Sequence, residues 1–209
     1  ADRLALSCAD GGCAISRRAA AIFQAHGVPH AWVPPSIDPA ELQGIPVDPR
    51  PRIVYTGNLD GYQDLHLLWR IREVLPLPLV VVTGSNGPVP DGVEVVRSAD
   101  PRAALQALAG ATLAVVPRRQ VAGFPIKLLN QLGLGVPTVV MKSAGLGIPG
   151  VLESTPAKLA VDLRTLASDP ELRARLAREG RDWVQTACSP TAQGRALEQL
   201  YRSVLGVDR

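Results

Sequence analysis

The 209-residue sequence predicts an α/β protein, in which helices cover both faces of a parallel sheet and further helices follow at the C-terminal end. From Arg52 onward, short apolar runs rich in β-branched residues alternate with segments of helical periodicity. The connections between these segments are short. Such alternation is typical of parallel strands joined by right-handed helical crossovers.

The first 50 residues predict a small β-α-β unit and a linker. We expect a strand over residues 3–7, a helix over residues 15–25 that ends at Gly27, and an extended run over residues 28–33. Prolines then recur up to Pro51, and proline lacks an N–H and fixes φ, so we expect a fairly stiff linker without regular structure. We therefore place a domain boundary near residue 50, between residues 1–50 and 51–209.

Strands and helices alternate through the first half of the main domain. The predicted strands are Ile53–Thr56, Leu79–Thr83 and residues 93–96, and the predicted helices cover residues 64–75 and 102–108, the latter capped by Asp100 and Pro101. Gly57 and Gly84 follow the first two strands directly. Either glycine alone would be read as an ordinary turn residue. Together they mark the carboxyl ends of two predicted strands.

The stretch from Val115 to Val140 organises the rest of the domain. It holds the end of one buried strand, Leu113–Val116, a loop, a short helix, and the start of another buried strand, Thr138–Met141. Gly123 permits close backbone approach, and Pro125 suits the first turn of the helix. Glycines and a proline after residue 132 end the helix.

Three cations surround the start of this predicted helix: Arg118, Arg119 and Lys127. A helix N-terminus at the carboxyl end of parallel strands offers unpaired N–H groups and a partial positive charge, so such positions bind phosphates. The alternative is a surface loop whose charges are simply solvated.

After Met141 we expect no further strand. A tract rich in glycine and proline, residues 143–150, leads to helices over residues 156–167, from Pro170 after an Asp169 cap, and over residues 191–205. Their apolar faces are expected to pack on the sheet or on a further domain.

Composition excludes several classes of protein. The net charge of +3 is scattered along the chain and only 4% of residues are aromatic, which argues against a nucleic-acid partner. No G-x-G-x-x-G fingerprint directly follows a predicted strand and opens a helix, and no P-loop or Asp-x-Asp motif is present, so we expect no cofactor and no metal. Three cysteines without metal-ligand spacing fit a reducing compartment and a cytoplasmic protein. No apolar segment is long enough to span a membrane, so we expect any association with a membrane to be peripheral.

The chain opens on Ala1, without methionine, and runs at once into an apolar segment. We therefore expect a piece of a longer protein.

Several motifs, in this order, resemble those of GT-B glycosyltransferases, close to retaining family four. They are Y-T-G-N-L at 55–59, V-T-G at 82–84, V-V-P at 115–117, G-F-P-I-K-L-L-N at 123–130, G-V-P-T-V-V at 135–140 and D-P-E-L at 169–172. The likeness is to the C-terminal, donor-binding half, a Rossmann-like domain. Residues 1–40 resemble the last β-α-β unit of the N-terminal half.

The resemblance implies a site for a nucleotide-sugar. Its diphosphate and sugar would face Gly57, Asn58, Gly123 and the helix start at Phe124, Pro125 and Ile126, and its base and ribose would lie near Gly84, Arg97 and Asn130. The two basic residues that usually grip the diphosphate are replaced by Asn58 and Gln63, and Arg118, Arg119 and Lys127 are the candidates to substitute for them. The paired glutamates of the family, spaced E-x7-E, are replaced by Ala122 and Asn130, whose amide oxygen can still accept a hydrogen bond from ribose.

The expected activity is transfer of a hexose from a nucleoside diphosphate sugar, with retention, to an acceptor such as a polysaccharide or glycolipid precursor. A missing N-terminal domain or partner chain would supply the acceptor site. Two alternatives stay open: a non-catalytic nucleotide-sugar-binding or assembly module, and a sugar-nucleotide epimerase of the same architecture. The substituted glutamates and cations fit either divergence or loss of activity.

Overall fold

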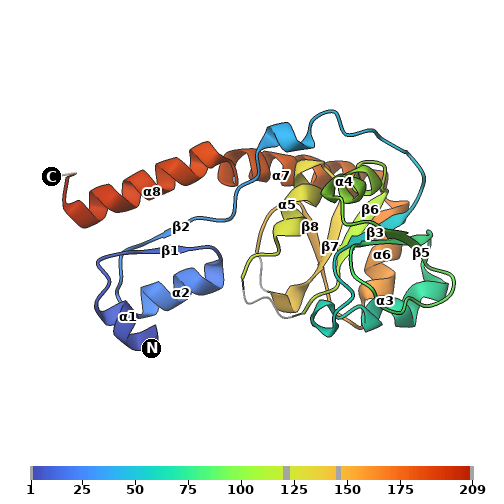
Figure 1. The fold of residues 1–209 in the computed structure, drawn as a ribbon, viewed down its shortest axis with the longest axis horizontal. Coiled ribbons are helices and arrows are strands. Elements are labelled where there is room, and N and C mark those ends of the chain that lie inside the picture. Colours follow the sequence, from blue (N-terminus) through green and yellow to red (C-terminus); the bar gives the residue numbers. More distant parts are fainter. Residues whose placement is uncertain (1, 120–122, 145–146, 208–209) are drawn as a thin grey trace.

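A six-stranded parallel sheet organises the chain in the computed structural model, which describes residues 2–119, 123–144 and 147–207 (Figure 1). The strand order is β5-β4-β3-β6-β7-β8, and each neighbouring pair is parallel. The strands are β3 (Ile53–Thr56), β4 (Leu79–Thr83), β5 (Glu94–Arg97), β6 (Leu113–Val116), β7 (Thr138–Met141) and β8 (Val151–Ser154). The order reverses at β3, because the chain first adds β4 and β5 on one side and then β6 to β8 on the other.

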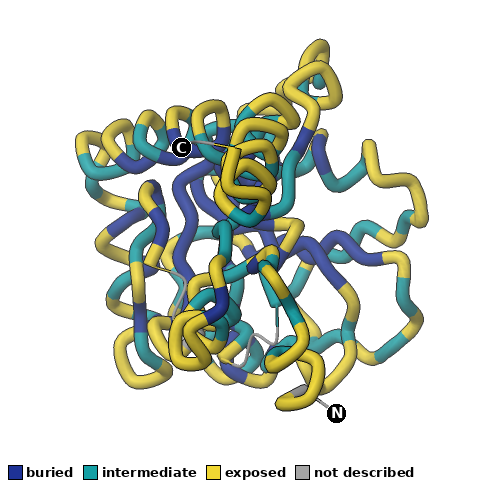
Figure 2. The backbone as a smooth tube through the Cα atoms, turned by 90° about the vertical axis from the view of Figure 1, so that its left-hand side faces the viewer, coloured by how far each residue is buried: buried dark blue, intermediate teal, exposed yellow. Residues whose placement is uncertain are grey.

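Helices cover both faces of this sheet. They are α3 (His66–Ile71), α4 (Pro101–Ala109), α5 (Ile126–Gly133), α6 (Leu159–Ser168) and α7 (Pro170–Ala187). Successive strand residues face opposite sides. Ile53 and Tyr55 therefore pack with α3 and α6, whereas Val54 packs with α4. Figure 2 shows the buried parts of the backbone gathered in the interior.

Side-chain caps define where several helices begin. The Asp100 carboxylate accepts a hydrogen bond from the Arg102 amide at 2.9 Å, and the Asp169 carboxylate accepts one from the Leu172 amide at 2.8 Å. Both caps precede a proline in the first turn, where the missing N–H has no cost. These caps were predicted from the sequence, and both are confirmed.

The N-terminal residues form a smaller unit. It contains α1 (Asp2–Ser7), β1 (Gly12–Ala14), α2 (Arg17–Ala25) and β2 (His30–Trp32), and β1 and β2 form a parallel pair in which Gly12 is opposite His30. The C-terminal helix α8 (Pro190–Leu205) extends from the main sheet to contact β2 (Figure 1). A 3-10 turn in the linker, Pro39–Leu42, packs on α5.

Two sequence predictions are wrong. Residues 3–7 form part of helix α1 and not a strand, because this run of Leu, Ala and Arg combines good helix formers and has no β-branched residue. Residues 151–154 form strand β8, although no strand was expected after Met141. Pairing with β7, from Thr138 opposite Val151 to Met141 opposite Ser154, stabilises this short edge strand.

The other elements agree with the predictions, apart from some of their ends. Helix α3 covers only His66–Ile71 of the predicted 64–75 and continues as a 3-10 turn, Arg72–Val74. The α/β fold class, with a parallel sheet between two layers of helices, is confirmed. The domain boundary near residue 50 stays a prediction. Over the described residues, we find no helix with the length and apolar character needed to cross a membrane.

Candidate functional site

A cavity of about 280 Å³ opens at the carboxyl ends of β3 and β4. This is where the strand order reverses, the position at which open α/β sheets bind ligands. The cavity is lined by residues that end these strands and by residues from the two nearest helices: Thr56, Gly57, Asn58, Val82, Thr83, Gly84, Ser98, Ala99, Asp100, Pro101, Ala104, Lys127 and Asn130. Five of the predicted site residues, Gly57, Asn58, Gly84, Lys127 and Asn130, therefore lie around one cavity.

Gly57 is required by packing inside the protein. A Cβ atom at this position would overlap the phenol of Tyr55, lying 2.6 Å from its Cζ atom. The Tyr55 hydroxyl donates a hydrogen bond to the Asn58 carbonyl at 2.7 Å, and burial raises the pKa of that hydroxyl. The hydrogen bond from the buried Tyr55 therefore stabilises the first turn after β3.

The loop after β4 supports the same turn and is itself held by the last residue of β5. Ser85 Oγ accepts a hydrogen bond from the Leu59 amide at 2.9 Å. Arg97 donates to the Ser85 carbonyl at 2.7 Å and to the Gly87 carbonyl at 2.8 Å. Arg97 was predicted to lie near the base or ribose, but it is not among the described residues that line the cavity. Its guanidinium instead holds the loop after Gly84.

Among the described residues, Lys127 is the cation that lines the cavity. It lies in the first turn of α5, and its side chain is exposed at the rim of the cavity. Desolvation beside the protein lowers the pKa of its ammonium, a shift that the Asp60 carboxylate opposes. Asn130, almost one turn further along α5, brings an amide to the same cavity.

The two arginines after β6 lie elsewhere. The Arg118 guanidinium stacks over the Tyr62 ring at 3.7 Å, and its partial burial lowers its pKa. The Arg119 guanidinium forms an ion pair with Asp64 at 2.7 Å. Within the described part of the chain, neither arginine lines the cavity.

The segment before α5 packs against other parts of the chain. Phe124 stacks on Trp183 of α7 with the ring centroids 6.0 Å apart, and a Cβ atom at Gly123 would lie 3.3 Å from Ile15 of the N-terminal unit. Pro125 is buried at the N-cap, whereas Ile126 is 64% exposed. These four predicted site residues lead into the turn that carries Lys127 but do not line the cavity. Ala122, the first position of the E-x7-E pattern, lies outside the described residues.

Sequence reasoning missed several polar residues at this edge. Thr83, Ser98 and Asp100 line the cavity, and Asp60 and Asp64 influence the cations beside it. Thr83, Asp60 and Ser98 end or follow predicted strands, so their place at the carboxyl edge of the sheet could have been inferred from the strand pattern. Asp64 and Asp100 were expected only as the start and the cap of predicted helices. The contacts with the cations could not be inferred in either way.

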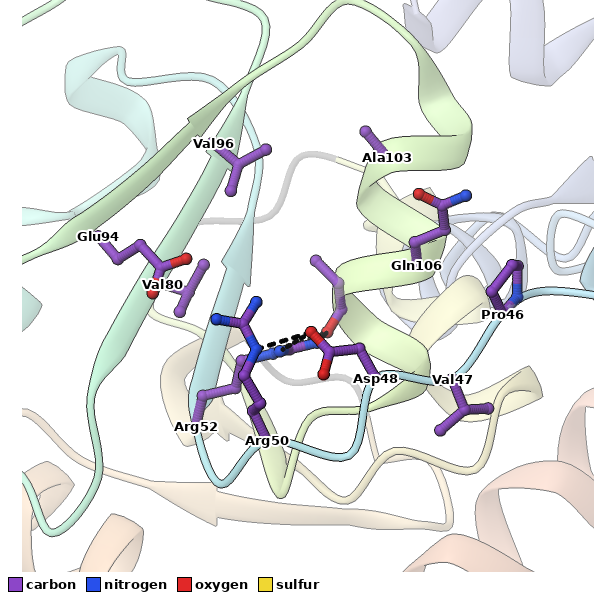
Figure 3. Close-up of a pocket in the computed structure, with 11 residues that line it drawn as sticks. Pro46, Val47, Asp48, Arg50, Arg52, Val80, Glu94, Val96, Ala103 and Gln106 are labelled. Carbon is purple, nitrogen blue, oxygen red and sulfur yellow. Dashed lines mark hydrogen bonds and ion pairs between the residues drawn. The ribbon is translucent and has the colours of Figure 1, made fainter.

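A second cavity, of about 320 Å³, lies near the opposite ends of the strands, between the linker, β4, β5 and α4 (Figure 3). The buried Arg52 donates to the Ala107 carbonyl at 3.0 Å and to Asp48 at 3.1 Å, and Arg50 also pairs with Asp48 at 2.7 Å. These contacts join the linker to α4. Asp48, Arg50 and Arg52 therefore serve the structure of the linker.

No family model matches this chain, and no curated protein matches its sequence. Solved structures do match its fold. A sucrose-phosphate synthase from Thermosynechococcus elongatus superposes with a TM-score of 0.77 over 99% of this chain at 19% identity. HepE from Anabaena, solved with UDP and glucose, superposes with a TM-score of 0.72 over 95% of this chain at 14% identity. WaaG, a glycosyltransferase involved in lipopolysaccharide biosynthesis, superposes with a TM-score of 0.63 over 90% of this chain at 17% identity.

The chain has the GT-B glycosyltransferase fold. It spans between 61% and 65% of the length of these proteins. The resemblance inferred from the motifs is thus confirmed at the level of the fold.

Proposed function

We propose that this chain is the donor-binding part of a glycosyltransferase and binds a nucleoside diphosphate sugar at the carboxyl edge of its main sheet. The observation that carries the proposal is the cavity between β3, β4 and α5, where the ammonium of Lys127 and the amide of Asn130 meet the glycines that follow two strands. Among the structures that share the fold, HepE was solved with UDP and with UDP-glucose.

Each group of the cavity has a role in this proposal. Lys127 and the N-terminus of α5 stabilise the diphosphate, and this stabilisation grows as the diphosphate leaves the sugar. Asn130 accepts a hydrogen bond from a ribose hydroxyl. Gly84 lies beside the position proposed for the base or ribose at the end of β4. We propose that the chain itself compensates the diphosphate charge without a metal, so EDTA should leave nucleotide binding unchanged.

The acceptor site is proposed to lie in a part of the enzyme beyond this chain. The chain spans about three fifths of the sucrose-phosphate synthase, which leaves room for a second domain in a protein of that size. A further domain or a partner chain would bring a polysaccharide or glycolipid precursor to the sugar, and hexose transfer with retention would follow in the cleft between the two parts. We place this reaction in the cytoplasm, in keeping with the free cysteines.

A calorimetric titration with UDP, GDP, ADP, dTDP and CMP tests the proposal. One nucleoside diphosphate should bind selectively, and Lys127→Met should weaken its binding about ten-fold or more, since charge-assisted hydrogen bonds are strong. Lys158→Met is the matched control, because it removes the same charge at the start of α6, away from the cavity. If no nucleotide binds, or if both variants bind equally well, Lys127 has no role in a nucleotide site.

A non-catalytic binding module is the second candidate. It is favoured by the uncharged Asn58 and Gln63, and by the engagement of Arg119 with Asp64. Selective nucleotide binding without sugar transfer, once the chain is rejoined to any preceding domain, would support this alternative. Turnover of a nucleotide-sugar without an acceptor would instead indicate an epimerase.

A further inference from the structure

Asp64 joins loops that are far apart in the sequence. Its Oδ2 accepts a hydrogen bond from the Arg119 amide at 2.8 Å, and its Oδ1 accepts from Arg119 Nη2 at 2.7 Å and Nε at 3.1 Å. The Arg119 carbonyl in turn accepts a hydrogen bond from Ser143 Oγ at 3.3 Å. The loops after β3, β6 and β7 are thereby connected at the carboxyl edge of the sheet.

The backbone at Asp64 is unusual. Asp64 is the one non-glycine residue in the described chain with a positive φ, at 54°. Asp is among the few residues that tolerate this left-handed conformation. The turn directs its carboxylate to Arg119, where only 12% of the Asp64 side chain stays exposed. The guanidinium holds the pKa of this carboxyl below its ordinary value, as expected of a committed ion pair.

Asp64 holds one end of the loop formed by residues 57–64. The other end is held by Tyr55, which donates to the Asn58 carbonyl, and by Ser85, which accepts from the Leu59 amide. Gly57 and Asn58 of this loop line the cavity proposed for the nucleotide. The position of the loop of residues 57–64 at the cavity therefore depends on contacts at both of its ends.

Arg119 cannot reach a ligand without a cost. Two of its guanidinium nitrogens already donate to Asp64. A diphosphate that took over these N–H groups would leave a largely buried carboxylate without its partner, which is strongly unfavourable. The ion pair also lies outside the described lining of the cavity.

We infer that Asp64 and Arg119 form a clamp that positions the loop of residues 57–64 beside the nucleotide site, and that Arg119 acts through Asp64 and does not bind the diphosphate itself. Asp64 and Arg119 are thus positioning residues. The inference rests on the proposed nucleotide site, and it changes the role predicted for Arg119 from the sequence.

A double-mutant cycle on nucleotide affinity separates a clamp from a ligand. Asp64→Gly removes the carboxylate while glycine keeps the left-handed backbone, and Arg119→Ala removes the guanidinium. We expect each variant to weaken UDP binding by about two- to five-fold, as loss of a partly exposed charged pair allows. The double variant should bind no more weakly than either single variant, because both changes open the same clamp.

Two results would overturn the inference. If Arg119→Ala weakens binding by the same factor in the Asp64→Gly protein as in the native protein, Arg119 contacts the ligand directly. If neither variant changes the affinity, the clamp has no bearing on the site.

Asp64→Asn, in which asparagine tolerates the same backbone but carries no charge, should give an intermediate loss of affinity. As a control, removal of the exposed Arg175–Glu179 pair in α7 should leave binding unchanged.

Hydrogen exchange tests the clamp without any ligand. The amides of residues 58–63 should exchange faster in Asp64→Gly and in Arg119→Ala than in the native protein, whereas the amides of β3 should not change. If UDP and the other nucleotides fail to bind the native protein, the proposed function fails, and this exchange experiment still decides the clamp. If the exchange rates of these amides stay unchanged in both variants, the clamp is refuted.

Discussion

Replacement of Gly57 by alanine tests how the turn after β3 is built. A methyl group there would lie 2.6 Å from Cζ and 3.2 Å from Cε1 of Tyr55, and closer still to the hydroxyl oxygen. Tyr55 is only 2% exposed and cannot move aside, and its hydroxyl holds the Asn58 carbonyl of the same turn. The methyl group must therefore displace either the buried ring or the turn.

The size of the effect follows from this collision. Overpacking of a buried site costs roughly 1–3 kcal/mol of the free energy of unfolding. In a chain of this length each kcal/mol lowers the melting temperature by about 2–4 °C. We therefore expect Gly57→Ala to melt roughly 2–12 °C below the native protein in a calorimetric or circular-dichroism scan.

Gly61→Ala is the matched control for this prediction. Gly61 lies in the same loop, but a Cβ atom there would meet no other atom within 4 Å, so this variant should melt with the native protein. In addition, Tyr55→Val removes the ring, so Gly57→Ala should cost less in that background. If Gly57→Ala melts together with Gly61→Ala, the buried contact with Tyr55 does not explain the glycine.

Two further predictions concern buried groups. Both polar atoms of the Gln131 side-chain amide are buried and have no hydrogen-bond partner among the described residues. Gln131→Met should therefore raise the free energy of unfolding by about 1–3 kcal/mol in urea titrations, whereas Gln106→Met, at an exposed position, should leave it unchanged. A loss of stability in Gln131→Met would show that the amide does have a hydrogen-bond partner. Cys188 is buried and its burial raises its pKa to about 12, so a thiol reagent at pH 8 should modify the exposed Cys8 and Cys13 of the native protein while Cys188 stays protonated and unreactive until unfolding. Modification of a third thiol in the native protein at pH 8 would contradict this.

Local patterns predicted much of the main sheet. The strands Ile53–Thr56, Leu79–Thr83, Leu113–Val116 and Thr138–Met141 have the predicted bounds, because each is a short β-branched run closed by glycine, proline or a polar residue. Strand β8 was missed, because its four residues follow a proline and a glycine and carry little pattern of their own. Its pairing with β7 decides its conformation.

The candidate site was predicted in part. The residues that end strands or lie on one helix face, such as Gly57, Gly84, Lys127 and Asn130, do gather around one cavity, because parallel strands bring their carboxyl ends to the same edge. Arg119 and Arg97 were placed at the ligand, and the structure gives them partners within the protein. A sequence records that a residue is charged but not which group neutralises it.

The sequence by itself therefore determined the class of fold, the parallel strands and the edge where a ligand is expected. These follow from hydrophobic periodicity and from glycine, proline and cap residues, which act over a few neighbouring positions. Only the tertiary structure decided that Gly57 must avoid Tyr55 and that Asp64 holds Arg119, 55 residues away. Such contacts depend on how separate segments pack against each other in space, and the conformational preferences of neighbouring residues do not determine that packing.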